Sequence, residues 1–367
     1  MDLYTLLIHN AEAGLEQLEE HMPAGHNGPY HDPETPVRNT SHWAITFLTA
    51  FRITGDEQYL DGVETCLSYL LSTEARPHGE TFRHRAIEGK DACNGLIGQA
   101  WTIEALATVG GELNREEPIE TARSVFLRHP FVDSLGGWKS VEIDGSVLGY
   151  HHTLNQQIWF AAAGAQLVAN ADNTTRIDRQ VRRFLDELRE NMYVYSSGLI
   201  YHNVRPRFSL QKYGILTFEN INRRRVPMPI LERFRPETKK DRKKRAIGYH
   251  SFNLYGLTLL KQIYPEHSFW HSTTFEKALA HSNSDRFKQE LETNPYGYPY
   301  NCTGIEMAVV AHVFNDDTET AREWLTEQFN RSLDPDTKLL TKNTEDAATM
   351  SARLYEATRL PNISNVC

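Results

Sequence analysis

The sequence has few cysteines and no long apolar run. Its 367 residues include four cysteines, none in a CxxC spacing, which argues against a disulfide framework or a cysteine zinc site. The longest stretch without a charged residue, 145–171, contains His151, Asn155 and Gln157, which a bilayer would reject. The first residues lack the basic and apolar regions of a secretory signal. We therefore predict a cytoplasmic protein with no transmembrane segment, no metal and no cofactor.

Acidic residues outnumber basic residues in the chain. The formal net charge is −9, which disfavours general nucleic-acid binding. Basic residues nevertheless gather in one part of the chain, at 223–225 and again at 239–245. Such a cluster favours contact with an anionic membrane surface or with a protein partner, and we predict that role for the segment 223–245.

Alternating β-type patterns are scarce as well, and helical periodicity dominates the chain. Turn residues and helix caps delimit twelve helical segments. We predict these at 2–21, 40–54, 56–73, 92–109, 115–129, 152–170, 174–193, 248–263, 267–282, 302–314, 318–332 and 344–358.

The predicted helices are of two kinds, which alternate along the chain. Segment 174–193 carries an apolar stripe that includes Ile177 and Val181, with charged residues on its other side. Segments 153–170 and 248–260 contain no charged residue, so they need cover on every side. A ring of neutral helices inside a ring of amphipathic helices meets this need. We predict an all-α fold, an (α/α)6 toroid of six helical hairpins, with an open α-solenoid as the alternative.

We expect one toroid domain over 1–367, interrupted by an insertion at 195–247. At roughly fifty residues, this stretch is far longer than an ordinary helix connection. Its tyrosine, phenylalanine, isoleucine and valine content favours short strands. Its length predicts a lid or a partner-binding segment.

The loops that lead into the neutral helices share His, Tyr, Asn and Gly. Residues 149–155 read GYHHTLN and residues 248–253 read GYHSFN, each at the start of a neutral helix. In a toroid the N-termini of all inner helices open toward one rim, where their dipoles favour a bound anion. Aromatic rings suit sugar faces, and amide, imidazole and guanidinium groups suit hydroxyls. We therefore predict a carbohydrate pocket on this rim, with plain helix capping as the alternative.

Catalytic candidates are ionisable groups on the same rim. Asp91 and Glu306 are the best-placed carboxylates, and His152 and His250 are candidate acids or bases because imidazole titrates near neutral pH. The predicted substrate-binding residues are His42, Trp43, Asn94, Tyr150, Asn155, Tyr249, Asn253, Tyr298, Tyr300 and Asn301. Four arginines are candidates to hold a substrate carboxylate, namely Arg38, Arg83, Arg85 and Arg205.

Two mechanisms suit these groups. Two carboxylates that flank a glycosidic bond would hydrolyse it. Bases on the two faces of a uronic acid ring would instead remove and return the proton at C5, with cations to stabilise the intermediate, and elimination is a related outcome. The abundance of His, Tyr and Arg favours epimerisation slightly.

Several stretches are similar to known families. HWAITFLTAFRITGDEQYL resembles the helix-pair signature of (α/α)6 sugar-processing enzymes, including sugar 2-epimerases and unsaturated uronyl hydrolases. NGLIGQAWTIEAL, HHTLNQQIWFAAAGAQL, GYHSFNLYGLTLL and NPYGYPYNCTGIEMA together resemble the AglQ-like proteins of archaeal protein-glycosylation clusters and related bacterial surface-polysaccharide loci. The resemblance implies processing of a hexuronic-acid-containing glycan, as an oligosaccharide or lipid-linked glycan, on the cytoplasmic side. It supplies no catalytic residue set, and the tyrosine-rich C-terminal signature of heparan glucuronyl C5-epimerases is missing.

These observations favour an enzyme that remodels a uronic-acid-containing glycan by epimerisation or isomerisation. A glycoside hydrolase or polysaccharide lyase on the same fold is the first alternative. A non-catalytic glycan-binding scaffold of a glycan-assembly complex is the second.

Overall fold

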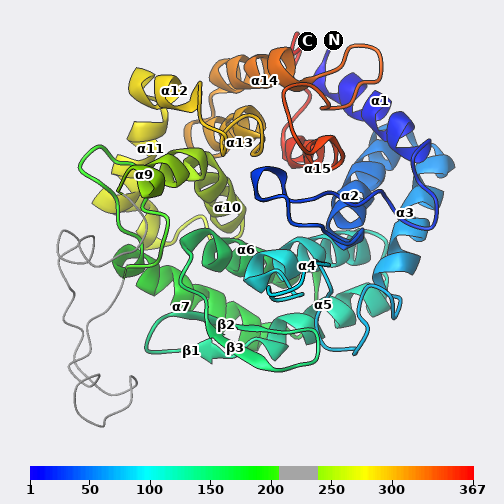
Figure 1. The fold of residues 1–367 in the computed structure, drawn as a ribbon, viewed down its shortest axis with the longest axis horizontal. Coiled ribbons are helices and arrows are strands. Elements are labelled where there is room, and N and C mark those ends of the chain that lie inside the picture. The colour runs from blue at the N-terminus through cyan, green and yellow to red at the C-terminus, as the bar shows by residue number, and fades with distance from the viewer. Residues whose placement is uncertain (206–238) are drawn as a thin grey trace.

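The chain folds as two concentric rings of helices. The computed structural model describes residues 1–205 and 239–367 (Figure 1). The inner ring consists of α2 (Val37–Thr54), α4 (Gly95–Glu112), α6 (Leu154–Asn170), α10 (His250–Ile263), α13 (Thr303–Asn315) and α15 (Ala347–Ala352), which the 3-10 segment η4 (Arg353–Arg359) continues. The outer ring consists of α1 (Leu3–Leu15), α3 (Glu57–Leu70), α5 (Glu116–Arg128), α7 (Thr175–Asn191), α11 (Thr273–Ser282) and α14 (Thr318–Ser332).

The ring is closed. From α2 to α13 each inner helix packs on the next, and η4 contacts both α13 and α2, which joins the last inner element to the first. Next to this junction, the Leu3 amide donates to the Ile363 carbonyl at 2.9 Å. Closure confirms the (α/α)6 toroid and excludes an open solenoid, whose end helices would not meet.

The two kinds of helix occupy the two rings. On α7, Ile177, Val181 and Leu188 are buried while its arginines face outward. On α4 nearly every residue is buried, and its one charged side chain, Glu104, pairs with Arg359 of η4 at 2.6 Å. The neutral inner helices are thus covered on all sides, as the composition predicts.

The remaining elements lie between the helix pairs. They are η1 (Gly28–Tyr30), β1 (Phe131–Val132), β2 (Gly137–Val141), β3 (Val147–Tyr150), α9 (Lys239–Gly248), η3 (Ser268–His271) and α12 (Asp285–Leu291). The three antiparallel strands fall outside the predicted insertion. Their signal in the sequence is weak because β2 buries residues on both faces, including Trp138, and so shows no alternation.

The insertion is only partly described. Residues 195–205 run as a loop with isolated bridges, Val194 to Ile200 and Thr153 to Asn203. The basic cluster at 239–245 forms most of α9, where Lys243 pairs with Glu290 at 2.8 Å. The rest of the insertion, with the basic residues at 223–225, lies outside the described residues, so its role as a lid or partner-binding segment stays a prediction.

Candidate functional site

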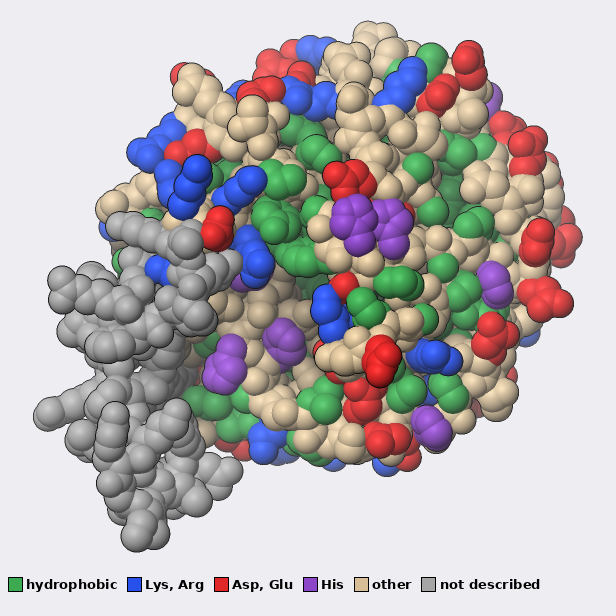
Figure 2. All heavy atoms as spheres, viewed as in Figure 1, with side chains coloured by type: hydrophobic (Ala, Val, Ile, Leu, Met, Phe, Trp, Pro, Cys, Tyr) green, Lys and Arg blue, Asp and Glu red, His purple; other side chains and the backbone are tan. Residues whose placement is uncertain are grey.

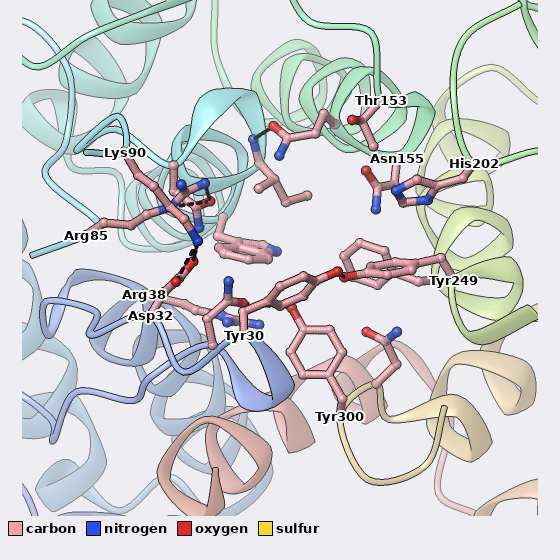
Figure 3. A pocket seen from close by; sticks show the side chains of 17 residues that line it. Tyr30, Asp32, Arg38, Arg85, Lys90, Thr153, Asn155, His202, Tyr249 and Tyr300 are labelled. Atoms are coloured by element: carbon pink, nitrogen blue, oxygen red, sulfur yellow. Dashed lines mark hydrogen bonds and ion pairs between the residues drawn. The ribbon is translucent and has the colours of Figure 1, made fainter. Parts of the chain in front are cut away.

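A cavity of about 240 Å³ opens at the rim where the inner helices begin (Figure 3). Its walls come from the loops that precede α2, α4, α6, α10 and α13 and from the first turns of several of these helices. The lining residues are Asn27, Tyr30, Asp32, Arg38, Arg85, Lys90, Asn94, Ile97, Trp101, Thr153, Asn155, Gln156, His202, Tyr249, Phe252, Tyr300 and Asn301. The cavity therefore occupies the place where the helix dipoles favour an anion.

One side of the cavity, which we call the cationic side, carries Arg38, Arg85 and Lys90 (Figure 3). Arg38 is only 2% exposed, stacks over Trp101 at 4.0 Å and contacts both oxygens of the buried Glu34 carboxylate at 3.3 Å through Nη1. Its Nε has no hydrogen-bond partner among the described residues. The guanidinium thus has one donor that no described protein group uses.

The other two cations have partners of different strength. Lys90 Nζ lies 2.6 and 2.7 Å from the two carboxylate oxygens of Asp32. Arg85 donates from Nε to Asn94 Oδ1 at 3.0 Å, and its Nη1 lies 3.6 Å from the Asp91 carboxylate. The Arg85 guanidinium counteracts the burial of Asp91, and the pKa of this carboxyl lies below its usual range. Asp91 is therefore a permanent negative charge just behind the cavity wall.

The opposite wall, which we call the aromatic side, carries Tyr30, Tyr249 and Tyr300 (Figure 3). The hydroxyls of Tyr30 and Tyr249 lie 3.0 Å apart, and the Tyr300 hydroxyl donates to Asn27 Oδ1 at 2.7 Å. The His202 ring lies beside Tyr249, with 5.0 Å between ring centroids. Burial raises the pKa of Tyr30 and of Tyr249 well above the usual tyrosine value, so both hydroxyls keep their protons.

A strap, residues 25–34, lies across both sides and supplies Asn27, Tyr30 and Asp32 to the lining. Asp346, the N-cap of α15, accepts from the amides of His26 at 2.9 Å and Gly28 at 3.2 Å. Gly28 has a φ of +52° and faces the Tyr300 ring so closely that a Cβ would collide with it. The glycine is what allows the strap to approach the aromatic side.

Seven predicted substrate-binding residues come together around the cavity. They are Arg38, Arg85, Asn94, Asn155, Tyr249, Tyr300 and Asn301. Asn155, in the first turn of α6, lines the cavity, and its Oδ1 is a buried acceptor with no hydrogen-bond partner among the described residues.

The four predicted catalytic residues do not line the cavity. His250 is fully buried, accepts from the Ile200 amide at Nδ1 and contacts the Ala278 carbonyl through Nε2 at 3.1 Å. Burial lowers the pKa of His250 to about 3, so it serves as a neutral structural group. His152 is exposed beside Tyr150, and Glu306 is buried under the wall.

The other predicted residues lie outside the lining for identifiable reasons. His42 is buried and stacks on Tyr355 at 4.3 Å, and Trp43 packs against Gly14 of the outer helix α1. The Asn253 amide donates to the Tyr249 carbonyl at 2.7 Å. The remaining four are Tyr150 on β3, Tyr298 under the Arg331 guanidinium, Arg83 exposed on its loop and Arg205 beside Tyr193.

Several lining residues were not predicted. Tyr30 and Asp32 belong to the stretch HNGPYHDP. Its His, Asn, Gly and Tyr match the composition of the other rim loops, so its place at the cavity could have been predicted from the sequence. Lys90 and Trp101 offer no such signal, because a lysine in a loop and a tryptophan in a neutral helix are common. His202 comes from the start of the insertion, which local pattern does not place at the rim.

The described residues contain no group of three or more His, Cys, Asp or Glu side chains placed to hold a metal ion. Among the same residues, every helix is too short or too polar to cross a membrane.

No protein-family model matches the sequence. Archaeal glycosylation protein Q of Haloferax volcanii is 44% identical over 362 residues, which cover 98% of this chain and 97% of the relative. The chain belongs to the family of that protein. The membership confirms the resemblance that the rim-loop and inner-helix motifs indicate.

Solved sugar-processing enzymes share the fold. A D-mannose isomerase superposes with a TM-score of 0.63 at 13% identity, covering 97% of this chain and 96% of that one. The unsaturated glucuronyl hydrolase of Bacillus sp. GL1 gives a TM-score of 0.63 at 12% identity, covering 98% and 95%. At these identities the likeness establishes the (α/α)6 fold and leaves the reaction to be argued from the site.

Proposed function

We propose that the protein is an enzyme of glycan biosynthesis that epimerises or isomerises a uronic-acid unit of an oligosaccharide or lipid-linked glycan. The observation that carries this proposal is the composition of the cavity lining. Three cations line it against one carboxylate, Asp32, which Lys90 already holds. Such a lining suits an anionic sugar and lacks the two free carboxylates of a glycosidase.

The cationic side is the seat of the substrate carboxylate. Arg38 and Arg85 both line the cavity, and Arg85 contacts Asp91 only at 3.6 Å, so we assign both guanidiniums to the ligand carboxylate. A carboxylate bound there makes the proton on the adjacent carbon more acidic, because the cations stabilise the enolate-like intermediate. Asn155, which also lines the cavity, then bonds a ring hydroxyl through its side-chain amide.

Proton transfer is assigned to the aromatic side. His202 is the proposed base, since its imidazole lines the cavity and lies beside Tyr249. Tyr30 is the proposed acid, because its hydroxyl stays protonated and bonds that of Tyr249 at 3.0 Å. We place the sugar ring between His202 and Tyr30, so that His202 removes the proton from one face and Tyr30 returns one to the other, which inverts the carbon; exchange with solvent then restores both groups.

The test is incubation with uronate oligosaccharides in deuterium oxide. An epimerase or isomerase incorporates solvent deuterium into the ring, and His202→Asn abolishes this incorporation. His271→Asn, an exposed histidine of η3 on the outer side, is the matched control and retains it.

Other products would overturn the proposal. New reducing ends without deuterium indicate a hydrolase. A product that absorbs in the ultraviolet as an unsaturated uronate indicates a lyase. An unchanged glycan that binds the protein indicates a non-catalytic scaffold.

A further inference from the structure

A buried charged cluster lies directly under the aromatic side. Arg353, the first residue of η4, is 1% exposed and bonds two carboxyl groups. Its Nη2 lies 2.5 Å from Glu306 Oε1 and 2.7 Å from Glu356 Oε1, and its Nε donates to Glu356 Oε1 at 2.8 Å. Two carboxyls from different elements, α13 and η4, thus share one guanidinium nitrogen.

The same guanidinium also donates hydrogen bonds to residues of the cavity wall. Arg353 Nη1 donates to Asn301 Oδ1 at 2.8 Å and to the Tyr300 carbonyl at 3.1 Å. The Asn301 amide in turn donates to the Gly248 carbonyl at 2.9 Å, next to Tyr249 in the chain. Arg353 and Asn301 together therefore tie the segments that precede α10 and α13, which carry two of the three cavity tyrosines.

The cluster carries more carboxyls than cations. Glu104, Glu306 and Glu356 face Arg353 and Arg359 across α4, α13 and η4. The other titratable or hydroxyl groups around them are Arg38, His42, Ser251, Tyr255, Tyr300, Cys302 and Tyr355.

None of these neighbours balances the excess carboxyl. Arg38 already pairs with Glu34, and burial lowers the pKa of His42 far below its usual value, so that this ring is neutral. Burial raises the pKa of the Cys302 thiol and of the tyrosines, so they also stay neutral. An unpaired buried carboxylate is costly, so a proton must replace the missing cation.

We propose that Glu306 and Glu356 share one buried proton against Arg353, and that this assembly positions the aromatic side of the cavity. Oε2 of both carboxyls has no hydrogen-bond partner among the described residues, but only Glu356 also faces Glu104, so we place the proton on Glu356. Arg353 Nη2 lies closer to Glu306, at 2.5 Å, than to Glu356, at 2.7 Å, which favours the charged form of Glu306. Glu306 is thereby a positioning residue rather than a catalytic one.

The pKa of Glu356 is consistent with this assignment. Burial raises it to about 8, and the neighbouring Glu306 contributes in the same direction against the opposing effect of Arg353. Two carboxyls that share a site cannot both ionise easily, and one of them keeps its proton to higher pH.

The shared proton is tested without any sugar. Glu356→Gln replaces a neutral carboxyl by an amide of the same shape. In the infrared spectrum at pH 7, the native protein should show the carbonyl band of a buried protonated carboxyl, and Glu356→Gln should lack it. Glu319→Gln, which breaks an exposed pair with Arg322 on α14, is the matched control and keeps the band. A native protein without the band overturns the proposal.

Thermal melting gives a second, independent readout. Because the folded state holds this proton more tightly than the unfolded state, its contribution to stability is full below the ordinary carboxyl pKa of 4.5. That contribution falls as pH rises and is lost by about pH 8. The melting temperature of Glu356→Gln relative to the native protein should therefore rise over that range. A constant difference contradicts the shared proton.

The positioning role is tested with Arg353→Lys, which keeps the charge and loses the fork of donors. We expect an altered near-ultraviolet circular dichroism from the tyrosines with unchanged helix content. Asn301→Ala should reproduce the change, and the double variant should add little to it. Folded Arg353→Lys protein with an unaltered aromatic spectrum overturns the role. If Arg353→Lys does not fold, Asn301→Ala alone carries the test.

Glucuronic acid is the binding probe, and this last arm rests on the proposed function. Its affinity should fall about tenfold in Arg353→Lys, which corresponds to about 1.4 kcal/mol. Equal affinity in native and variant protein contradicts the positioning role. A native protein that does not bind glucuronic acid contradicts the proposed function instead, while the infrared, melting and dichroism results still decide the inference.

Discussion

The cationic and aromatic sides of the cavity use their buried polar groups in opposite ways. On the cationic side Lys90 and Arg38 pair with protein carboxylates from the strap, Asp32 and Glu34. On the aromatic side Tyr30 and Tyr249 bond each other and remain neutral. The space-filling view shows the cations and carboxylates of this face interspersed around the hollow at the centre of the ring (Figure 2).

This difference indicates that the two sides of the cavity recognise different parts of a ligand. A ligand carboxylate on the cationic side must share guanidinium donors with protein carboxylates, so its binding depends on charge. A sugar ring on the aromatic side meets neutral hydroxyls, so its binding depends on shape and hydrogen bonds. Charge recognition and ring orientation are therefore separable by substitution.

The largest effect is expected from Arg38→Gln. This change leaves Glu34 buried beside an uncharged amide, and removing one partner of a buried ion pair costs about 3–5 kcal/mol of folding free energy. Chemical denaturation should show that loss, and calorimetry should show no measurable glucuronic acid binding. Adding Glu34→Gln should restore most of the stability without restoring the binding. If the double variant binds glucuronic acid with native affinity, Arg38 does not bind the substrate carboxylate.

A smaller effect is expected from Lys90→Gln, which frees Asp32 to repel an anion. Lys90 is about half-exposed, so stability should change by less than about 1 kcal/mol. The affinity for glucuronic acid should fall about tenfold, or about 1.4 kcal/mol, because the freed Asp32 carboxylate repels the sugar carboxylate. The affinity for neutral glucose should stay the same, and Lys243→Gln on α9 is the control. An equal loss of affinity for glucuronic acid and glucose would contradict the assignment of charge recognition to the cationic side.

How far the sequence predicts this site depends on the kind of contact involved. The repeated motif at the inner-helix starts correctly places Tyr249 and Asn155 on the cavity wall, because it reflects one local geometry used more than once. It does not tell Tyr249 from His250. Successive residues at a helix start point about 100° apart, and only packing against Ala278 shows that His250 faces away from the cavity.

Long-range pairs mark the limit of sequence reasoning. The toroid follows from the alternation of charged and neutral helices, which is local. The pairing of Lys90 with Asp32 and the contacts of Arg353 with Glu306 and Asn301 join residues far apart in the chain. Nothing in the local pattern fixes which loop meets which, so these contacts emerge only when the ring closes.

On the aromatic side, Tyr249→Phe removes one hydroxyl and should act on both sugars alike. Loss of the bond to Tyr30 costs about 1 kcal/mol of folding free energy and leaves the Tyr30 ring less well oriented, so we expect glucuronic acid and glucose to bind more weakly by the same small factor. Calorimetry with both sugars measures this, and Tyr264→Phe, whose hydroxyl bonds Asp178 between outer elements, is the control. A loss confined to glucuronic acid would assign charge recognition to the aromatic side as well.

The smallest effect is expected from His26→Gln, in the strap that joins the two sides. Partial burial lowers the pKa of His26, but its bond to the Glu345 carbonyl and the nearby Asp346 carboxylate outweigh burial and raise it. The charged ring thus stabilises the strap fully below pH 6.5, and this contribution is lost as pH rises through the elevated pKa. The variant should melt slightly lower at pH 5.5 and like the native protein at pH 8. Because the strap carries both Tyr30 and Asp32, glucose and glucuronic acid should lose the same small factor at pH 5.5; unequal losses would mean that the strap acts on one side only.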